Sequence, residues 1–281
     1  MLKKINYFLP TLSQSWIIVF YMLFIGSILA VPVTLVFISN DVTTPMWLLY
    51  VIPFIPPFIY AIIKGKGAAE KGLTRPVAIE ATNLGSMNPI IFGVICIIAT
   101  FSLGIVLEPL ATCIPMPDSF KKLFEDLVSN GATSFITAAI LAPILEEFFL
   151  RGIITRGLFY NEKPLRAILW GAVIFAIIHM NPWQAIGAFI IGIFLGWVYW
   201  RTHSLLAVIF IHFVNNGTAV ALSNILPDIE GDTTNLDLLT RYNAEQYYIP
   251  IYIFALAIVV GSIYVFNKQL PKSSFNTTEQ Y

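Results

Sequence analysis

The segment Leu145–Arg151 places three charged side chains, those of Glu146, Glu147 and Arg151, inside a stretch that is otherwise as apolar as a membrane-spanning helix. One charge at the centre of a bilayer helix costs roughly 2.5 to 3.5 kcal/mol on insertion scales, so three would cost on the order of 8 to 10 kcal/mol if the costs were additive. A fold that contains this segment must compensate these charges. We therefore expect a polar cavity inside the membrane that contains a reactive site.

The composition is that of an integral membrane protein. Of the 281 residues, 57% are hydrophobic and 11% are charged, whereas a soluble domain carries about 25% charged residues. The mean hydropathy is +0.78. The formal net charge is zero, so no bulk basicity argues for nucleic acid, and we expect no nucleic-acid partner. The two cysteines, Cys96 and Cys113, provide no disulfide framework and no zinc-thiolate spacing.

Eight segments meet or approach the length of about 20 apolar residues that a helix needs to cross a bilayer. They are Trp16–Phe37, Met46–Ile63, Pro89–Leu110, Ala132–Gly157, Leu165–His179, Trp183–Tyr199, Leu205–Ile225 and Ile249–Phe266. The fifth segment is short, and Pro53, Pro56 and Pro57 should kink the second because proline removes a backbone donor. The sequence predicts an all-α, polytopic membrane bundle of about eight transmembrane helices with a membrane-embedded polar cavity.

The distribution of lysine and arginine predicts the orientation, because cytoplasmic connections are enriched in both residues. With the N-terminus inside, twelve of them lie on the cytoplasmic side and three on the opposite side. Both termini are therefore predicted to be cytoplasmic. We divide the chain into N-terminal helices and loops without a motif (1–131), a core of helices four to seven (132–225), and an outer loop, last helix and polar tail (226–281).

The predicted fourth helix carries an acid-base pair and one further carboxylate. Glu147 and Arg151 are four residues apart, so they stack on one helix face in the favourable order for an ion pair. Glu146 is rotated by about 100° from Glu147 and need not share that pair. One carboxylate can therefore be held as a structural partner while the other is free to act.

Two of the three histidines of the chain lie in predicted spans. His179 follows Phe175 by four residues, which places both on one helix face. His212 precedes Asn216 by four residues and shares a face with it in the same way. A carboxylate beside a histidine can take a proton from water, and a histidine with an amide can donate to an oxyanion. Such a group could hydrolyse an amide bond, but polarity alone leaves helix-helix contacts and transport paths equally open.

The three motifs together resemble a known family. Glu146-Glu147-x-x-x-Arg151, Phe175-x-x-x-His179 and His212-x-x-x-Asn216 follow one another on the predicted fourth, fifth and seventh helices. This pattern is similar to that of the CAAX protease and bacteriocin-processing (CPBP, or Abi) family of intramembrane proteases, which includes the type II CAAX prenyl endopeptidases. The matching region runs from about residue 132 to residue 221. Three ordered motifs form a specific signal, whereas any one alone would be weak.

The resemblance implies an endopeptidase in which a glutamate activates water, with no covalent intermediate, in a cavity that opens toward the cytoplasm. By motif position, Glu146 would be the general base, and His179 would help to hold the water. Glu147 and Arg151 would shape the site. The implied partners are the lipid bilayer and a membrane-associated peptide or protein substrate, either CAAX-type or bacteriocin-like.

The remaining motif would supply the oxyanion site, formed by His212 and Asn216. Members of the family were long described as metalloproteases, so a zinc-dependent version with His179, His212 and a glutamate as ligands stays an alternative. No His-Glu-x-x-His helix is present, and an amide side chain is a poor zinc ligand, so we expect no cofactor.

His203 matches no motif, and we expect it to be interfacial. A non-enzymatic transporter or scaffold is the alternative from another class.

Overall fold

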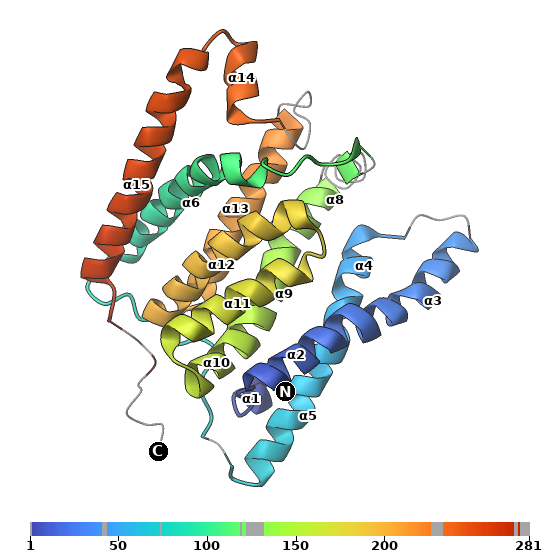
Figure 1. The fold of residues 1–281 in the computed structure, drawn as a ribbon. Coiled ribbons are helices and arrows are strands. Elements are labelled where there is room, and N and C mark those ends of the chain that lie inside the picture. The colour runs from blue at the N-terminus through green and yellow to red at the C-terminus, as the bar shows by residue number, and fades with distance from the viewer. Residues whose placement is uncertain are drawn as a thin grey trace.

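The structure is a computed structural model that describes residues 2–40, 44–73, 75–118, 120–121, 132–225, 233–272 and 275. Within these ranges every regular element is a helix and no strand is present, as the sequence predicted (Figure 1). The first part of the predicted outer loop, residues 226–232, and most of the polar tail lie outside the described residues.

The N-terminal part forms two rods (Figure 1). After a short α1 (Leu2–Ile5), the first rod consists of α2 (Leu12–Phe20), the π-helical η1 (Tyr21–Gly26) and α3 (Ser27–Ile38). The second rod consists of α4 (Met46–Val51), the 3-10 turn η2 (Ile52–Phe54) and α5 (Ile55–Glu70). The regular helix gives way to η2 at the proline segment because proline lacks the N–H that would continue the α-helical pattern.

The rest of the chain contains the longest continuous helix. We call the helix from Ala132 to Asn161 the central rod; it consists of α8 (Ala132–Ser134), the π-helical η3 (Phe135–Leu141), α9 (Ala142–Glu147), the π-helical η4 (Phe148–Thr155) and α10 (Arg156–Asn161). The helices α11 (Pro164–Ile178), α12 (Pro182–Thr202) and α13 (Leu205–Ile225) pack against it. Beyond them lie α6 (Pro89–Ala111), α14 (Asn235–Arg241), the 3-10 turn η5 (Glu245–Tyr247) and α15 (Tyr248–Gln269), and α15 packs on α6.

In the described part of the chain, six helices are long and apolar enough to cross a membrane. They are Leu12–Ile38, Met46–Glu70, Pro89–Ala111, Pro182–Thr202, Leu205–Ser223 and Glu245–Gln269. The predicted fourth and fifth spans correspond to the central rod and to α11. With 15 residues, α11 is about 22 Å long and shorter than the roughly 30 Å hydrocarbon core, as expected. The chain is an integral, multi-pass membrane protein.

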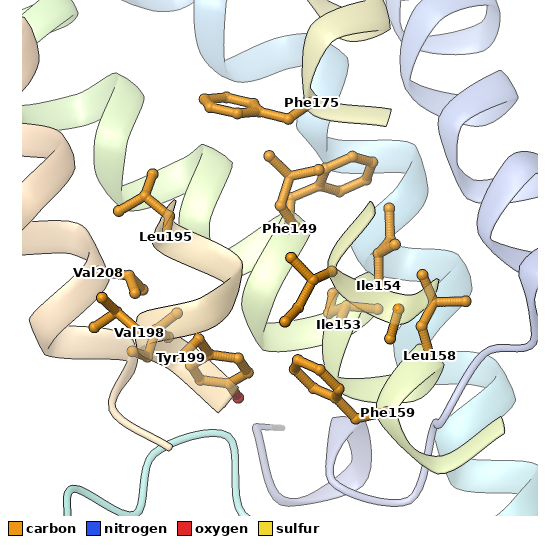
Figure 2. Close-up of a cluster of buried hydrophobic side chains, with 14 of the residues drawn as sticks. Phe149, Ile153, Ile154, Leu158, Phe159, Phe175, Leu195, Val198, Tyr199 and Val208 are labelled. Atoms are coloured by element: carbon orange, nitrogen blue, oxygen red, sulfur yellow. The ribbon is translucent and has the colours of Figure 1, made fainter. Parts of the chain in front are cut away.

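The central rod is surrounded by protein along its second half. Every residue from Phe149 to Phe159 is buried. Figure 2 shows how Phe149, Ile153 and Leu158 of the rod, together with side chains of α11, α12 and α13, form one apolar cluster. A helix that is buried on all faces is a core helix, so its polar side chains face other helices rather than lipid.

Small residues bring α11 and α12 close together. A Cβ at Gly192 would lie 3.1 Å from the Cα of Ala172, and one at Gly196 would lie 3.3 Å from the Cγ2 of Ile168. Both contacts would be tight for any larger residue, and small residues are the usual contact surface between membrane helices. This packing places Phe175 of α11 beside the central rod.

The N-terminal residues dock against the C-terminal end of the central rod. Arg156 is fully buried and donates to the carbonyl oxygens of Ile5 at 2.8 Å, Phe8 at 3.1 Å and Val77 at 2.6 Å. Directly beside it, a Cβ on Gly157 would lie 2.4 Å from the backbone nitrogen of Pro10. The N-terminal segment and the connection after α5 therefore both contact the same turn of the central rod.

We predict that Gly157→Ala destabilises the protein, because the new methyl group meets the backbone of Pro10, which has no flexible end to move away. Overpacking of this kind costs about 1 to 3 kcal/mol. Thermal unfolding of the detergent-solubilised protein measures the effect. Gly104→Ala is the matched control, because no described atom lies within 4 Å of its added Cβ. Equal melting temperatures for the two variants would contradict the docking contact.

Candidate functional site: a buried polar cluster

Two π-helical stretches flank the short helix α9, on which the paired glutamates lie. Glu146 is 8% exposed and Glu147 is fully buried. π-helical turns are rare and frequently mark functional sites. The local geometry therefore singles out the same two residues as the charge pattern of the sequence.

Glu147 is the centre of the buried cluster. Its Oε1 accepts from Nη1 of Arg151 at 2.8 Å and lies 2.8 Å from Nδ1 of His212. The second guanidinium nitrogen, Nη2, donates to the carbonyl oxygen of Gly192 at 3.0 Å. The predicted ion pair is thus present, and the imidazole from α13 adds a partner that the sequence did not predict.

The contact with Glu147 fixes the tautomer of His212. A carboxylate only accepts, so the proton of this hydrogen bond is on Nδ1 of the imidazole. In neutral His212 the other nitrogen, Nε2, is then an acceptor, whereas in the imidazolium both nitrogens donate. Nε2 points toward Glu146, whose Oε2 lies 3.8 Å away.

Glu146 has one bonded and one open carboxylate oxygen. Its Oε1 accepts a hydrogen bond from the hydroxyl of Tyr50. Its Oε2 is buried and has no hydrogen-bond partner in the described part of the chain. A separation of 3.8 Å from His212 is too long for a direct hydrogen bond, and polar atoms at such a distance are commonly bridged by water.

His179 ends helix α11 and is half-buried. Its Nδ1 lies 2.7 Å from the carbonyl oxygen of Phe175, which requires the proton on Nδ1 and leaves Nε2 of the neutral ring as an acceptor. The predicted pair on one face is thus in contact. The Phe175 ring also packs edge-on against the His212 ring, at 5.5 Å between centroids, and lies beneath the Arg151 guanidinium.

Asn216 lies one turn beyond His212 but faces a different neighbour. Its Nδ2 donates to the carbonyl oxygen of Ala138 in the central rod at 2.9 Å, and its Oδ1 accepts from Asn215 at 3.1 Å. An amide carries two N–H groups, so one remains for another acceptor. This residue fixes the approach of α13 to the central rod.

The structure therefore joins three of the six predicted site residues by hydrogen bonds, Glu147, Arg151 and His212, and places Oε2 of Glu146 at 3.8 Å from His212. His179 joins them through the shared contact with Phe175. Asn216 is adjacent on α13 and is bonded to the rod.

A catalytic zinc ion would need three suitable ligand side chains close together. Among the residues that the structure describes, no group of three or more His, Cys, Asp or Glu side chains could hold a metal ion. In both His179 and His212, Nδ1 is bound by a protein acceptor and Nε2 is the nitrogen that could bind a metal, as is common for metal-bound histidines.

Sequence reasoning missed Tyr50, which lies in α4 far from any motif. A signal was present, because a tyrosine within an apolar membrane segment needs a partner for its hydroxyl. The partner could not be read from spacing, since Tyr50 and Glu146 are 96 residues apart.

The third histidine stands apart from the cluster. His203 lies in the turn between α12 and α13, and its Nε2 is 2.8 Å from the carbonyl oxygen of Ala78. Burial lowers the pKa of His203, which favours the neutral ring. Its contacts are thus with the connection between α5 and α6, not with the glutamates.

Comparison with known proteins gives one match. Residues 128–218, about a third of the chain, match the family described as Type II CAAX prenyl endopeptidase Rce1-like. Neither a curated protein nor a solved structure matches the chain. The matched region includes all three motifs and excludes Tyr50. The segment that builds the buried polar cluster is therefore similar to type II CAAX prenyl endopeptidases, in agreement with the resemblance that the three motifs indicated.

Proposed function

We propose that this protein hydrolyses peptide bonds of membrane-associated peptides with a water molecule activated by Glu146. The observation that carries the proposal is the open Oε2 of Glu146, buried and 3.8 Å from Nε2 of His212. A buried acceptor without a partner is costly unless water or substrate satisfies it. A carboxylate in this situation is suited to accept a proton from water.

The reaction needs only groups of the cluster and one water molecule. Glu146 takes a proton from water while the water oxygen bonds to the carbonyl carbon of the peptide. The resulting oxyanion accepts hydrogen bonds from imidazolium His212 and from the second N–H of Asn216. When the C–N bond breaks, Glu146 returns the proton to the leaving amine. The products are a carboxylic acid and an amine, and no enzyme-bound ester forms.

The other residues support these steps. His179 offers its Nε2 as an acceptor for the second hydrogen of the water. Glu147 and Arg151 compensate each other's charge and hold the His212 ring. The glutamates contribute two negative charges and Arg151 one positive charge, so an imidazolium at His212 would bring the cluster to zero net charge.

The substrate must reach a site enclosed by membrane helices, so we propose a peptide that is itself anchored in or near the bilayer. Prenylated C-terminal CAAX peptides and bacteriocin-like peptides are the two candidates. With both termini in the cytoplasm, as the lysine and arginine distribution predicts, cleavage would take place in the cytoplasmic half of the bilayer.

We expect Glu146→Gln to abolish cleavage of a membrane peptide by the purified protein, with a loss of at least about a hundredfold, because an amide cannot accept the proton. Its melting temperature should remain near that of the wild type, since the amide oxygen can still accept from Tyr50. Peptide cleavage assayed by mass spectrometry, together with thermal unfolding, measures both quantities. Full activity of this variant would refute the mechanism.

The corresponding substitution at the neighbouring glutamate, Glu147→Gln, should lower the stability of the protein. Glu147→Gln leaves the buried Arg151 without its counter-charge, and removing one partner of a buried pair costs about 3 to 5 kcal/mol. We therefore expect a clearly lower melting temperature for this variant, measured in the same detergent. A wild-type melting temperature would show that Glu147 is not the compensating charge.

We expect cleavage to survive exhaustive chelation, because the proposed steps use no metal. The measurement is the rate of peptide cleavage before and after treatment with a chelator, and after return of zinc. Loss of activity that zinc restores would favour the zinc-dependent protease. Uptake of a solute into proteoliposomes, without any proteolysis, would favour the transporter.

A further inference from the structure

The contact between Tyr50 and Glu146 joins the family-like region to a helix outside it. Glu146 lies within residues 128–218, which match the endopeptidase family, whereas Tyr50 lies in α4. The contact is the hydrogen bond from the tyrosine hydroxyl to Oε1 of the glutamate. A helix without any motif thus reaches the proposed general base.

Aromatic packing holds Tyr50 in place. Its ring lies 5.7 Å from that of Phe54, which in turn packs edge-on against Phe149 at 5.7 Å. One turn further along α5, Phe58 packs edge-on against Phe148 at 5.5 Å. Phe148 and Phe149, which follow Glu147 on the central rod, therefore pack against the rod that contains α4 and α5. This packing fixes the distance between Tyr50 and Glu146.

The hydrogen bond decides which carboxylate oxygen of Glu146 is open. A carboxylate bound at neither oxygen can rotate about its terminal torsion, which is broad and roughly two-fold. The donor on Oε1 selects one orientation, and in this orientation Oε2 faces Nε2 of His212 at 3.8 Å. Without the donor, the carboxylate could turn away from the imidazole and from the water between them.

We propose that Tyr50 is a positioning residue for the hydrolytic reaction. Its hydrogen bond orients Oε2 of Glu146 toward the water and toward His212. The proposal rests on the function proposed above. It assigns the N-terminal helices a part in catalysis: they complete a site that the three motifs alone leave without a donor to Glu146. Tyr50 itself does not contact the substrate in this scheme.

The first experiment compares Tyr50→Phe with Tyr60→Phe. Tyr60 lies in α5 of the same rod, and its described ring contacts are with Phe8, Tyr21 and Lys64. Each variant loses one hydroxyl from the N-terminal rods. Steady-state cleavage of a membrane peptide gives kcat and KM, and thermal unfolding gives the melting temperature.

We expect Tyr50→Phe to lower kcat by about tenfold to a hundredfold, the range for a hydrogen bond to a charged group, with KM changed less than about twofold. Tyr60→Phe should retain the wild-type kcat. A loss of melting temperature with unchanged kcat, or equal losses of kcat in both variants, would overturn the positioning role.

A double-mutant cycle tests the contact without using activity. Tyr50→Phe should change the melting temperature of the wild type but not that of Glu146→Ala, because the partner is already absent. Additive effects would overturn the contact. A wild-type protein that cleaves no membrane peptide would overturn the proposed function and this role with it. Cleavage that depends on Glu146 but not on Tyr50 would overturn only the role of Tyr50.

Discussion

The fold depends on how a membrane protein holds two adjacent carboxylates without exposing them to lipid. The solution is the hydrogen-bonded group around Glu147, in which Arg151 supplies the opposite charge and His212 a second donor to the same oxygen. Burial of an ion pair is tolerated only when the geometry is good and the remaining donors are satisfied. Protein, not lipid, surrounds the second half of the central rod, and both terminal nitrogens of Arg151 have acceptors. Nε of Arg151 and Oε2 of Glu147 are buried without a partner in the described part of the chain.

Glu146 and Glu147 are adjacent on the central rod but have different environments, and the proposed catalytic role of Glu146 depends on this difference. Glu147 is fully buried and has two protein donors on one oxygen, so it is suited to a fixed negative charge. Glu146 is turned by about 100° on the helix, has one donor and keeps one oxygen open. Both Oε2 atoms are buried without a partner in the described part of the chain, and that of Glu146 lies 3.8 Å from Nε2 of His212. In the proposed function, Glu147 therefore serves stability and Glu146 serves reactivity.

Local spacing predicted the parts of the site that lie within one helix, and failed for those that join helices. The pairs Glu147–Arg151 and Phe175–His179 are four residues apart, and both are in contact. The hydrogen bond from His212 to Glu147 spans 65 residues and that from Tyr50 to Glu146 spans 96. Such partners follow from how the rods pack, which hydrophobic periodicity does not determine because nearly all faces of these helices are apolar.

The division of the chain at residue 131 describes where motifs occur, but contacts essential to the central rod cross it. Arg156 binds carbonyl oxygens of Ile5, Phe8 and Val77, so the buried guanidinium has its acceptors only when the N-terminal part is docked. The same docking brings α4 to Glu146. A buried cation without acceptors is strongly destabilising, and therefore docking of the N-terminal part stabilises the C-terminal end of the central rod. We infer that the N-terminal helices and the core form one structural and functional unit.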